Sequence, residues 1–337
     1  MSVLSGAARI PPTVKILDGL APAGGGAVMG TGIVSIGLEL AHQRVLSQIL
    51  FAIAVLLWLG LAAAFLRRRL RQRKRWLEEA RTPEALTAIA GTAVLGARAA
   101  ATGSDWASWL LLAIALVAWI RLVPSVLRHW RTPTVGISFM LAVATESLAV
   151  VTALLGIHDR RSWLATAALA LMLVGIAAYL FVLARVDLGQ LTDGGGDQWV
   201  FGGALAIAAL ACARTSTALT ATSDLAGLHG TLVDVTLALW AAAALWLPAL
   251  LAAELISPRL RYDTRRWATV FPFGMYAVCS VATGSATGIG GIGSFGRVWI
   301  WVALAVWAIV MAGMLRRSRR LFSLRHRTSY NRGPDRN

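Results

Sequence analysis

The chain has 337 residues, of which 57% are hydrophobic and only 14% are charged, and its mean hydropathy is +0.67. These values exclude an ordinary soluble domain and are typical of a protein that crosses a membrane many times. The net charge of +16 comes from short basic runs between apolar stretches, so no soluble basic face is available for a nucleic acid. Only two cysteines are present, which excludes a disulfide framework and a Cys-x-x-Cys metal site.

The N-terminal segment 1–19 has no long apolar core, so we interpret it as a short cytoplasmic segment at the membrane surface and not as a cleavable signal peptide. A spanning helix needs roughly 20 mostly apolar residues, and this criterion predicts ten transmembrane helices. The predicted spans are 20–41, 46–66, 84–103, 106–127, 134–156, 161–185, 198–220, 229–254, 266–287 and 297–315. Residues 20–315 are expected to form one domain, followed by a basic cytoplasmic tail at 316–337.

The basic residues are divided unevenly between the two sides of the predicted membrane domain. All but six of the 32 lysines and arginines belong to the termini and to the loops after even-numbered spans. The six on the other side are Arg44, Arg98, Arg160, Arg161, Arg214 and Arg297. Because cytoplasmic loops have the excess of basic residues, both termini are predicted to be cytoplasmic. The strong preference for arginine over lysine hints at a bacterial genome, so we expect a bacterial inner membrane.

Residue size alternates from one predicted span to the next. Odd-numbered spans are rich in small residues, whereas ten of the 14 tryptophans fall in even-numbered spans. Small residues let helices approach closely or line a narrow path, and aromatic bulk suits surfaces that face lipid. The pattern predicts five helical hairpins, each with an inner odd helix and an outer even helix around a central path. Close packing without a pore would explain the small residues equally well.

Three charged residues on the predicted inner spans are candidates for a functional role. Arg98 and Arg214 lie toward the outer ends of spans three and seven, where guanidinium groups could draw anions into a vestibule. The alternative is that these side chains snorkel to the membrane surface or form ion pairs, with Glu39 as a possible partner. Glu146 lies near the middle of span five, where an ionised side chain is costly. It could couple proton movement to transport, or it could pair with an arginine.

Two glycine-rich stretches receive different interpretations. Gly30, Thr31 and Gly32 in the first span are candidates to line the path, because small residues there could bring backbone dipoles close to an ion. Close helix packing explains them almost as well. The stretch 284–296 lacks the Gly-Lys-Ser/Thr ending of a phosphate-binding loop, and we predict a mobile external loop there.

The ninth predicted span contains a proline, Pro272, which removes one backbone donor from the helix. Phe271 and Phe273 flank the proline and Gly274 follows it. A freed carbonyl at membrane depth is tolerated where neighbouring helices or a water-filled cavity satisfy it. A ring that projects from such a bend could close a narrow pore by excluding water. Ordinary core packing around an incidental kink is the alternative.

Five segments, in chain order, form a recognisable set. They are VMGTGIVSIGLEL (28–40), FMLAVATESLAVVTALLG (139–156), DQWVFGGALAIAALA (197–211), LWLPALLAAEL (245–255) and LRYDTRRWATVFPFGMYAV (260–278). These segments resemble the first, fifth, seventh, eighth and ninth helices of the tellurite-resistance/dicarboxylate transporter family. That family includes the bacterial TehA permeases, fungal malate and sulfite exporters, and plant slow anion channels. The resemblance covers nearly the whole chain.

The resemblance implies an all-α integral membrane fold of ten helices, arranged as five hairpins in a quasi-fivefold ring around a central pore, often as a homotrimer. It also implies that a phenylalanine beside the helix-kinking proline occludes the pore. The family's Trp-x-x-x-Phe-Pro pattern, aligned on Trp267 to Pro272, gives that role to Phe271, with Phe273 as the fallback. Glu146 is a departure, because related sequences commonly have glutamine there.

The sequence therefore predicts a permease that passes small anions, either C4-dicarboxylates or inorganic oxyanions and halides, through a pore gated by Phe271. Two alternatives remain open: a proton-coupled dicarboxylate carrier that uses Glu146, and a membrane scaffold or sensor with a non-conducting pore. An enzyme is not expected, because the chain lacks the His-Glu-x-x-His and Gly-x-Ser-x-Gly motifs. The expected partners are small anions, the lipid bilayer and two further copies of the chain, with no cofactor and no nucleic acid.

Overall fold

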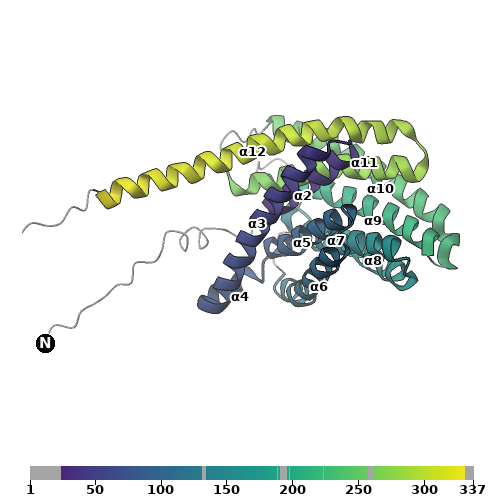
Figure 1. Ribbon diagram of the computed structural model, residues 1–337, viewed down its shortest axis with the longest axis horizontal. Helices are drawn as coiled ribbons and strands as arrows, with labels where there is room; N and C mark the ends of the chain where they lie inside the picture. The colour runs from purple at the N-terminus through teal and green to yellow at the C-terminus, as the bar shows by residue number, and fades with distance from the viewer. Residues whose placement is uncertain are drawn as a thin grey trace, which may run out of the picture.

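The computed structural model describes residues 24–130, 134–187, 189, 196, 198–222, 224–256 and 262–330 (Figure 1). The predicted N-terminal segment 1–19 and the end of the predicted tail, 331–337, lie outside this described part. Within it the chain is almost entirely helical, and the recorded β-bridge is an isolated one.

The described part of the chain contains long α-helices and several short helices, most of which directly precede a long one. In chain order they are α2 (Gly25–Leu40), α3 (Arg44–Arg71), α4 (Arg73–Glu79), η2 (Pro83–Leu86), α5 (Thr87–Ala101), α6 (Asp105–Arg128), η3 (Gly136–Phe139), α7 (Met140–Asp159), α8 (Ser162–Leu183), α9 (Trp199–Thr222), η5 (Asp224–Leu228), α10 (His229–Ile256), η6 (Thr264–Arg266), α11 (Trp267–Thr287) and α12 (Gly290–Tyr330). The described part of each predicted span overlaps one of the long α-helices.

Seven helices in the described residues are long and apolar enough to cross a membrane, so the chain is an all-α integral membrane protein. They are α3, α6, α7 with η3, α8, α9, α10 and α12 up to Arg319. The other three long helices, α2, α5 and α11, are shorter or less apolar. They are also buried by their neighbours, so they need not present an apolar surface to lipid.

Burial divides the long helices into two groups. Most residues of α2, α5, α7, α9 and α11 are buried, and we call these the five buried helices. In contrast, only 17–28% of the apolar stretches of α3, α6, α8, α10 and α12 is buried. The alternation of small and bulky spans therefore corresponds to an inner and an outer set of helices.

The contacts between helices follow the same division. Each buried helix packs against the outer helix that follows it in the chain, which gives five hairpins from α2–α3 to α11–α12. The buried helices also contact one another in the order α2, α5, α7, α9, α11 and back to α2. The core of the molecule lies among these five helices.

The glycine-rich stretch 284–296 is not the external loop that the sequence predicts. Its first residues end α11, which stops at Gly288 with a left-handed φ of 73°, and its last residues begin α12. The glycines allow the two helices to approach closely, because a Cβ on Gly296 would lie 2.5 Å from the carbonyl oxygen of Ala277. The loop prediction is wrong because most of this stretch is helical, and at Gly284 and Gly296 close helix packing, not flexibility, accounts for the glycine.

Helix α12 also continues far beyond the predicted end of the tenth span. It runs from Gly290 to Tyr330, and its distal part projects past the other helices (Figure 1). The start of the predicted tail is therefore helical. Near the bundle, Arg317 Nη1 donates a hydrogen bond to the backbone oxygen of Tyr262 at 3.4 Å.

Candidate functional site

A cavity of about 190 Å³ lies at the N-terminal ends of the five buried helices. Residues from each of these helices, or from the short segment that leads into it, line the cavity, so the five helices begin at the same end of the molecule. The lining includes Gly26, Met29, Glu84, Thr87, Ile137, Met140, Val200, Arg265, Trp267, Ala268 and Phe271. The first turn of a helix has unpaired N–H groups and the positive end of the helix dipole, so this position favours an anion.

Two charged side chains of opposite sign line the cavity. Glu84 lies in η2, and it also lines a second, larger cavity of about 410 Å³ that reaches Glu78 and His129. Arg265 lies in η6, where its Nε and Nη2 donate to Asp263 Oδ2 at 3.1 Å and 3.0 Å. Partial burial disfavours ionisation of Asp263, but the hydrogen bonds and charge of Arg265 outweigh it and hold the pKa of this carboxyl below its usual value.

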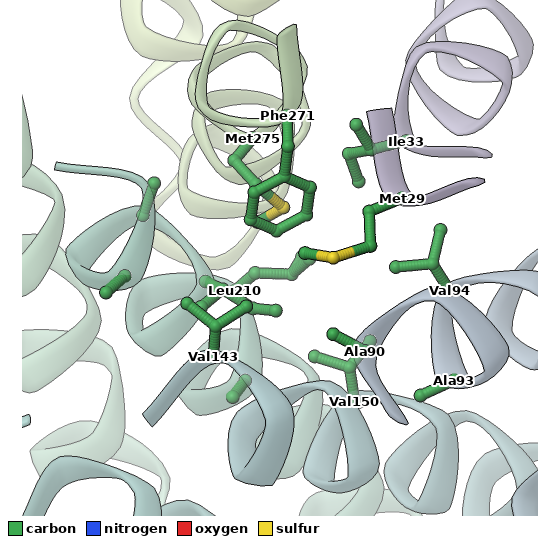
Figure 2. Packing of buried hydrophobic residues seen from close by; sticks show 14 of the residues in the cluster. Met29, Ile33, Ala90, Ala93, Val94, Val143, Val150, Leu210, Phe271 and Met275 are labelled. Atoms are coloured by element: carbon green, nitrogen blue, oxygen red, sulfur yellow. The ribbon is translucent and has the colours of Figure 1, made fainter. Parts of the chain in front are cut away.

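Phe271 lines the cavity from α11. Its side chain is buried and lies among apolar side chains from all five buried helices (Figure 2). The other labelled members of this cluster are Met29, Ile33, Ala90, Ala93, Val94, Val143, Val150, Leu210 and Met275. We call this cluster of hydrophobic side chains the apolar plug. Met29 and Phe271 belong to it and also line the cavity. Buried hydrophobic side chains of the five buried helices therefore pack together next to the cavity.

Phe273 has different surroundings from Phe271. Its ring packs 4.7 Å from the ring centroid of Trp199 on α9 and stacks 5.5 Å from that of Trp299 on α12. It does not line the cavity. The two phenylalanines that flank Pro272 therefore have different surroundings. Phe271, the residue that the Trp-x-x-x-Phe-Pro pattern assigns as the gate, is the one that lines the cavity.

Pro272 and Gly274 pack against neighbouring helices. Pro272 lies within a continuous α11 and faces Gly203 of α9, where an added Cβ would be 2.9 Å from the proline ring. A Cβ on Gly274 would lie 2.5 Å from Ile33 of α2. The glycines Gly203 and Gly274 therefore permit α11 to approach its two neighbours among the buried helices, α9 and α2.

The three candidates on α2 also face other helices. Gly30 packs against Val270 of α11 and Gly32 against Val94 of α5, where added Cβ atoms would be 2.9 Å and 2.7 Å from these side chains. Thr31 Oγ1 accepts a hydrogen bond from Trp307 Nε1 of α12 at 3.0 Å. None of the three lines the cavity, so their contacts match the close-packing alternative.

Arg98 is buried where α2, α3 and α5 meet. Its Nη2 donates to Glu39 Oε2 at 3.0 Å and to Ser47 Oγ at 2.8 Å, and its Nε donates to Ser35 Oγ at 3.1 Å. The ion pair with Glu39 that the sequence suggested as an alternative is present. These contacts explain how a guanidinium group is accommodated there, because a buried charge needs a partner and hydrogen bonds.

Arg214 differs from Arg98 in having no hydrogen bond or ion pair to any residue that the structure describes. It lies in the C-terminal half of α9 and is partly exposed. The cavity is at the other end of this helix, at Val200. An arginine with its charge uncompensated is therefore placed beyond the apolar plug, toward the opposite end of the bundle.

Glu146 is fully buried on α7 but does not line the cavity. Its side chain faces Gly175 of α8, the outer helix of the same hairpin, and a Cβ at Gly175 would overlap it. Neither carboxyl oxygen has a hydrogen-bond partner among the described residues. No arginine pairs with Glu146 in this part of the chain.

Sequence reasoning missed the residues at the cavity mouth, above all Glu84 and Arg265. Glu84 is the first residue of the predicted span 84–103, and Arg265 lies directly before the predicted span 266–287. A signal was present at Thr82-Pro83-Glu84, because proline favours the first helical position and an acidic residue favours the first turn. This motif predicts the start of one helix. It does not predict that the N-terminal ends of the five buried helices meet at one cavity.

Comparisons with known proteins give one family and two relatives. Residues 20–315 match the family model SLAC1, described as voltage-dependent anion channel. Two proteins from different strains of Mycobacterium tuberculosis, both named uncharacterized membrane proteins, are 34% identical to this chain over 151 residues. That alignment covers 43% of this chain and 76% of each relative.

Proposed function

Because the chain belongs to the voltage-dependent anion channel family, we propose that it conducts small anions along the axis of the five buried helices. The family match covers most of the chain and confirms the resemblance predicted from the five sequence motifs. Membership of this family implies an anion channel or transporter activity. The observation that supports our proposal most strongly is the cavity at the five helix N-termini, which ends at Phe271 on that axis.

The proposed architecture consists of ten transmembrane helices in a quasi-fivefold ring around this axis. The five hairpins and the closed order of contacts among the buried helices support it. The cavity then opens to the cytoplasm, in agreement with the excess of basic residues in the loops on that side. We propose the bacterial inner membrane as the location and a homotrimer with one pore in each copy as the assembly.

The proposed gate is the ring of Phe271. It lies between the cavity and the half of the bundle that contains Arg214, and its apolar surroundings exclude water from the axis. An anion attracted by the helix N-termini on one side and by Arg214 on the other meets its main barrier at this ring. The proposed cargo is a C4-dicarboxylate, an inorganic oxyanion or a halide.

Conductance measurements in planar bilayers test the gate, with Phe271→Ala compared to Phe273→Ala. Removing the Phe271 ring should raise anion conductance by at least about tenfold, the change that about 1.4 kcal/mol of lost barrier produces. The Phe273 variant is a matched control, because it loses the same ring from the same helix but outside the cavity. Equal conductance of the two variants would contradict the gate.

The same preparations separate the proposed channel from its alternatives. A proton-coupled carrier that uses Glu146 should lose the pH dependence of uptake in Glu146→Gln, whereas a channel should keep its conductance. The position of Glu146 outside the cavity supports the channel. A scaffold or sensor should pass no anion even in Phe271→Ala, and it should lose its partner on deletion of residues 318–337. An anion panel that includes malate, sulfite, nitrate, chloride and tellurite then identifies the cargo.

A further inference from the structure

A groove of about 180 Å³ lies between the outer helices α3 and α6 and shares no lining residue with the cavity at the buried helices. Its walls include Leu61 and Phe65 of α3 and Ile114 and Ala118 of α6. Both helices are long and apolar enough to span a membrane, and Phe65 and Ile114 are exposed. The groove therefore faces the hydrocarbon region of a bilayer.

One end of the groove is polar and positively charged. Arg68 is 4% exposed and donates to Glu79 Oε2 at 2.9 Å, while Arg75 donates to Glu79 Oε1 at 3.0 Å. Two guanidinium groups thus share one carboxylate. Trp76 also lines this end, and its indole N–H is buried without an acceptor among the described residues. The guanidinium of Arg69 lies 5.8 Å from the centroid of the Trp76 ring.

The chain around this end adds further positive charge. Residues 67–75 contain six arginines and one lysine, directly after the apolar part of α3. A cluster of this size next to a membrane span attracts anionic lipid, and basic pockets between spans bind lipid head groups. An apolar groove that ends at one unmatched donor, the indole N–H of Trp76, and at a cluster of positive charge is complementary to an amphiphile with an anionic head.

We propose that the groove between α3 and α6 binds one anionic phospholipid of the adjacent leaflet. An acyl chain lies against Leu61, Phe65 and Ile114. The phosphate lies at the end of α3, where it accepts a hydrogen bond from the indole N–H of Trp76 and faces the guanidinium groups of Arg68 and Arg69. This lipid site does not depend on anion conduction, because it lies outside the proposed pathway.

Native mass spectrometry of the purified, delipidated full-length protein provides the first test. Phosphatidylglycerol and phosphatidylcholine with identical acyl chains are titrated onto separate samples. The proposal predicts one phosphatidylglycerol bound per chain, with at least several-fold weaker binding of phosphatidylcholine. Equal binding of the two lipids would overturn the proposal, because apolar contacts alone would then explain it.

Two adjacent alanines on α3 provide a matched pair of variants. Ala62 lines the groove whereas Ala63 does not, and both are exposed. Ala62→Trp should fill the groove and abolish binding of phosphatidylglycerol, while Ala63→Trp should bind it as the unmodified chain does. Trp76→Phe keeps the ring but removes the donor, so the affinity should fall by up to about tenfold.

Two results with these variants would overturn the lipid site. One is full retention of phosphatidylglycerol by Ala62→Trp. The other is a change of oligomeric state in Ala62→Trp with lipid binding unaffected, because this would make a second copy of the chain the occupant of the groove. Light scattering on the same samples measures the oligomeric state.

Discussion

At the scale of single residues, the two arginines that the sequence selected have different environments. Arg98 is held by Glu39, Ser35 and Ser47, and all of these contacts are between helices α2, α3 and α5. Arg214 has no hydrogen bond or ion pair among the described residues. The two should therefore have separable roles, one in holding the fold and the other in attracting anions.

Substitution of each arginine by glutamine tests this distinction. Arg98→Gln should lower the free energy of unfolding by about 2 kcal/mol, because it leaves Glu39 and two serines without their donor. Arg214→Gln should change stability by less than about 0.5 kcal/mol but should lower anion conductance in a Phe271→Ala background. Thermal unfolding in detergent and bilayer recordings measure the two effects. A stability loss in Arg214→Gln as large as that in Arg98→Gln would contradict the assignment.

The environment of Glu146 could be predicted from the sequence only in part. The sequence made this carboxyl a candidate for the anion path, because it stands alone in an apolar span, and the structure shows that the residue is fully buried. The sequence could not indicate which neighbour the side chain meets. Since α7 is apolar and buried on nearly every side, its sequence contains little signal for how the helix is rotated. Gly175 became visible as the neighbour only in the structure.

At the scale of helices, the sequence predicted the long helices well, but the prediction of an external loop at 284–296 was wrong. Length and hydropathy indicate a spanning helix because the bilayer demands both. Glycine is ambiguous, since it permits either a flexible loop or the close approach of two helices. The stretch 284–296 was interpreted in the first way, whereas in the structure the ends of α11 and α12 pack together there.

Two glycines of that stretch provide a test of the close approach of α11 and α12. A Cβ on Gly296 would lie 2.5 Å from a backbone oxygen of α11, whereas a Cβ on Gly291 would meet nothing within 4 Å. Gly296→Ala should lower the free energy of unfolding by about 1–3 kcal/mol through overpacking. Gly291→Ala lies in the first turn of α12 and should be neutral or slightly stabilising. Equal melting temperatures for the two variants would show that the helices do not pack as described.

At the scale of the whole molecule, the arrangement of the buried helices has an electrostatic consequence. Their N-terminal ends line one cavity, so five positive dipole ends face the same small volume. Each dipole end acts only within about one helix turn, which is why the cavity and not the apolar plug is favourable for an anion. The sequence could not predict this convergence, because it depends on contacts between helices that are far apart in the chain.

The central claim is that anions pass through this cavity and past Phe271. It is tested most directly by a thiol introduced at Ala268, which lines the cavity one turn before Pro272. Current through the double variant Phe271→Ala/Ala268→Cys is recorded before and after modification with a negatively charged methanethiosulfonate. The native Cys212 and Cys279 are fully buried and should not react. Phe271→Ala/Ala63→Cys is the control, with its thiol on the outer face of α3.

Modification at position 268 should remove most of the current, because it places bulk and negative charge in the path of the anion. Modification at position 63 should leave the current unchanged. Current that persists after complete modification at position 268, verified by mass spectrometry, would contradict a pathway along the axis of the five buried helices.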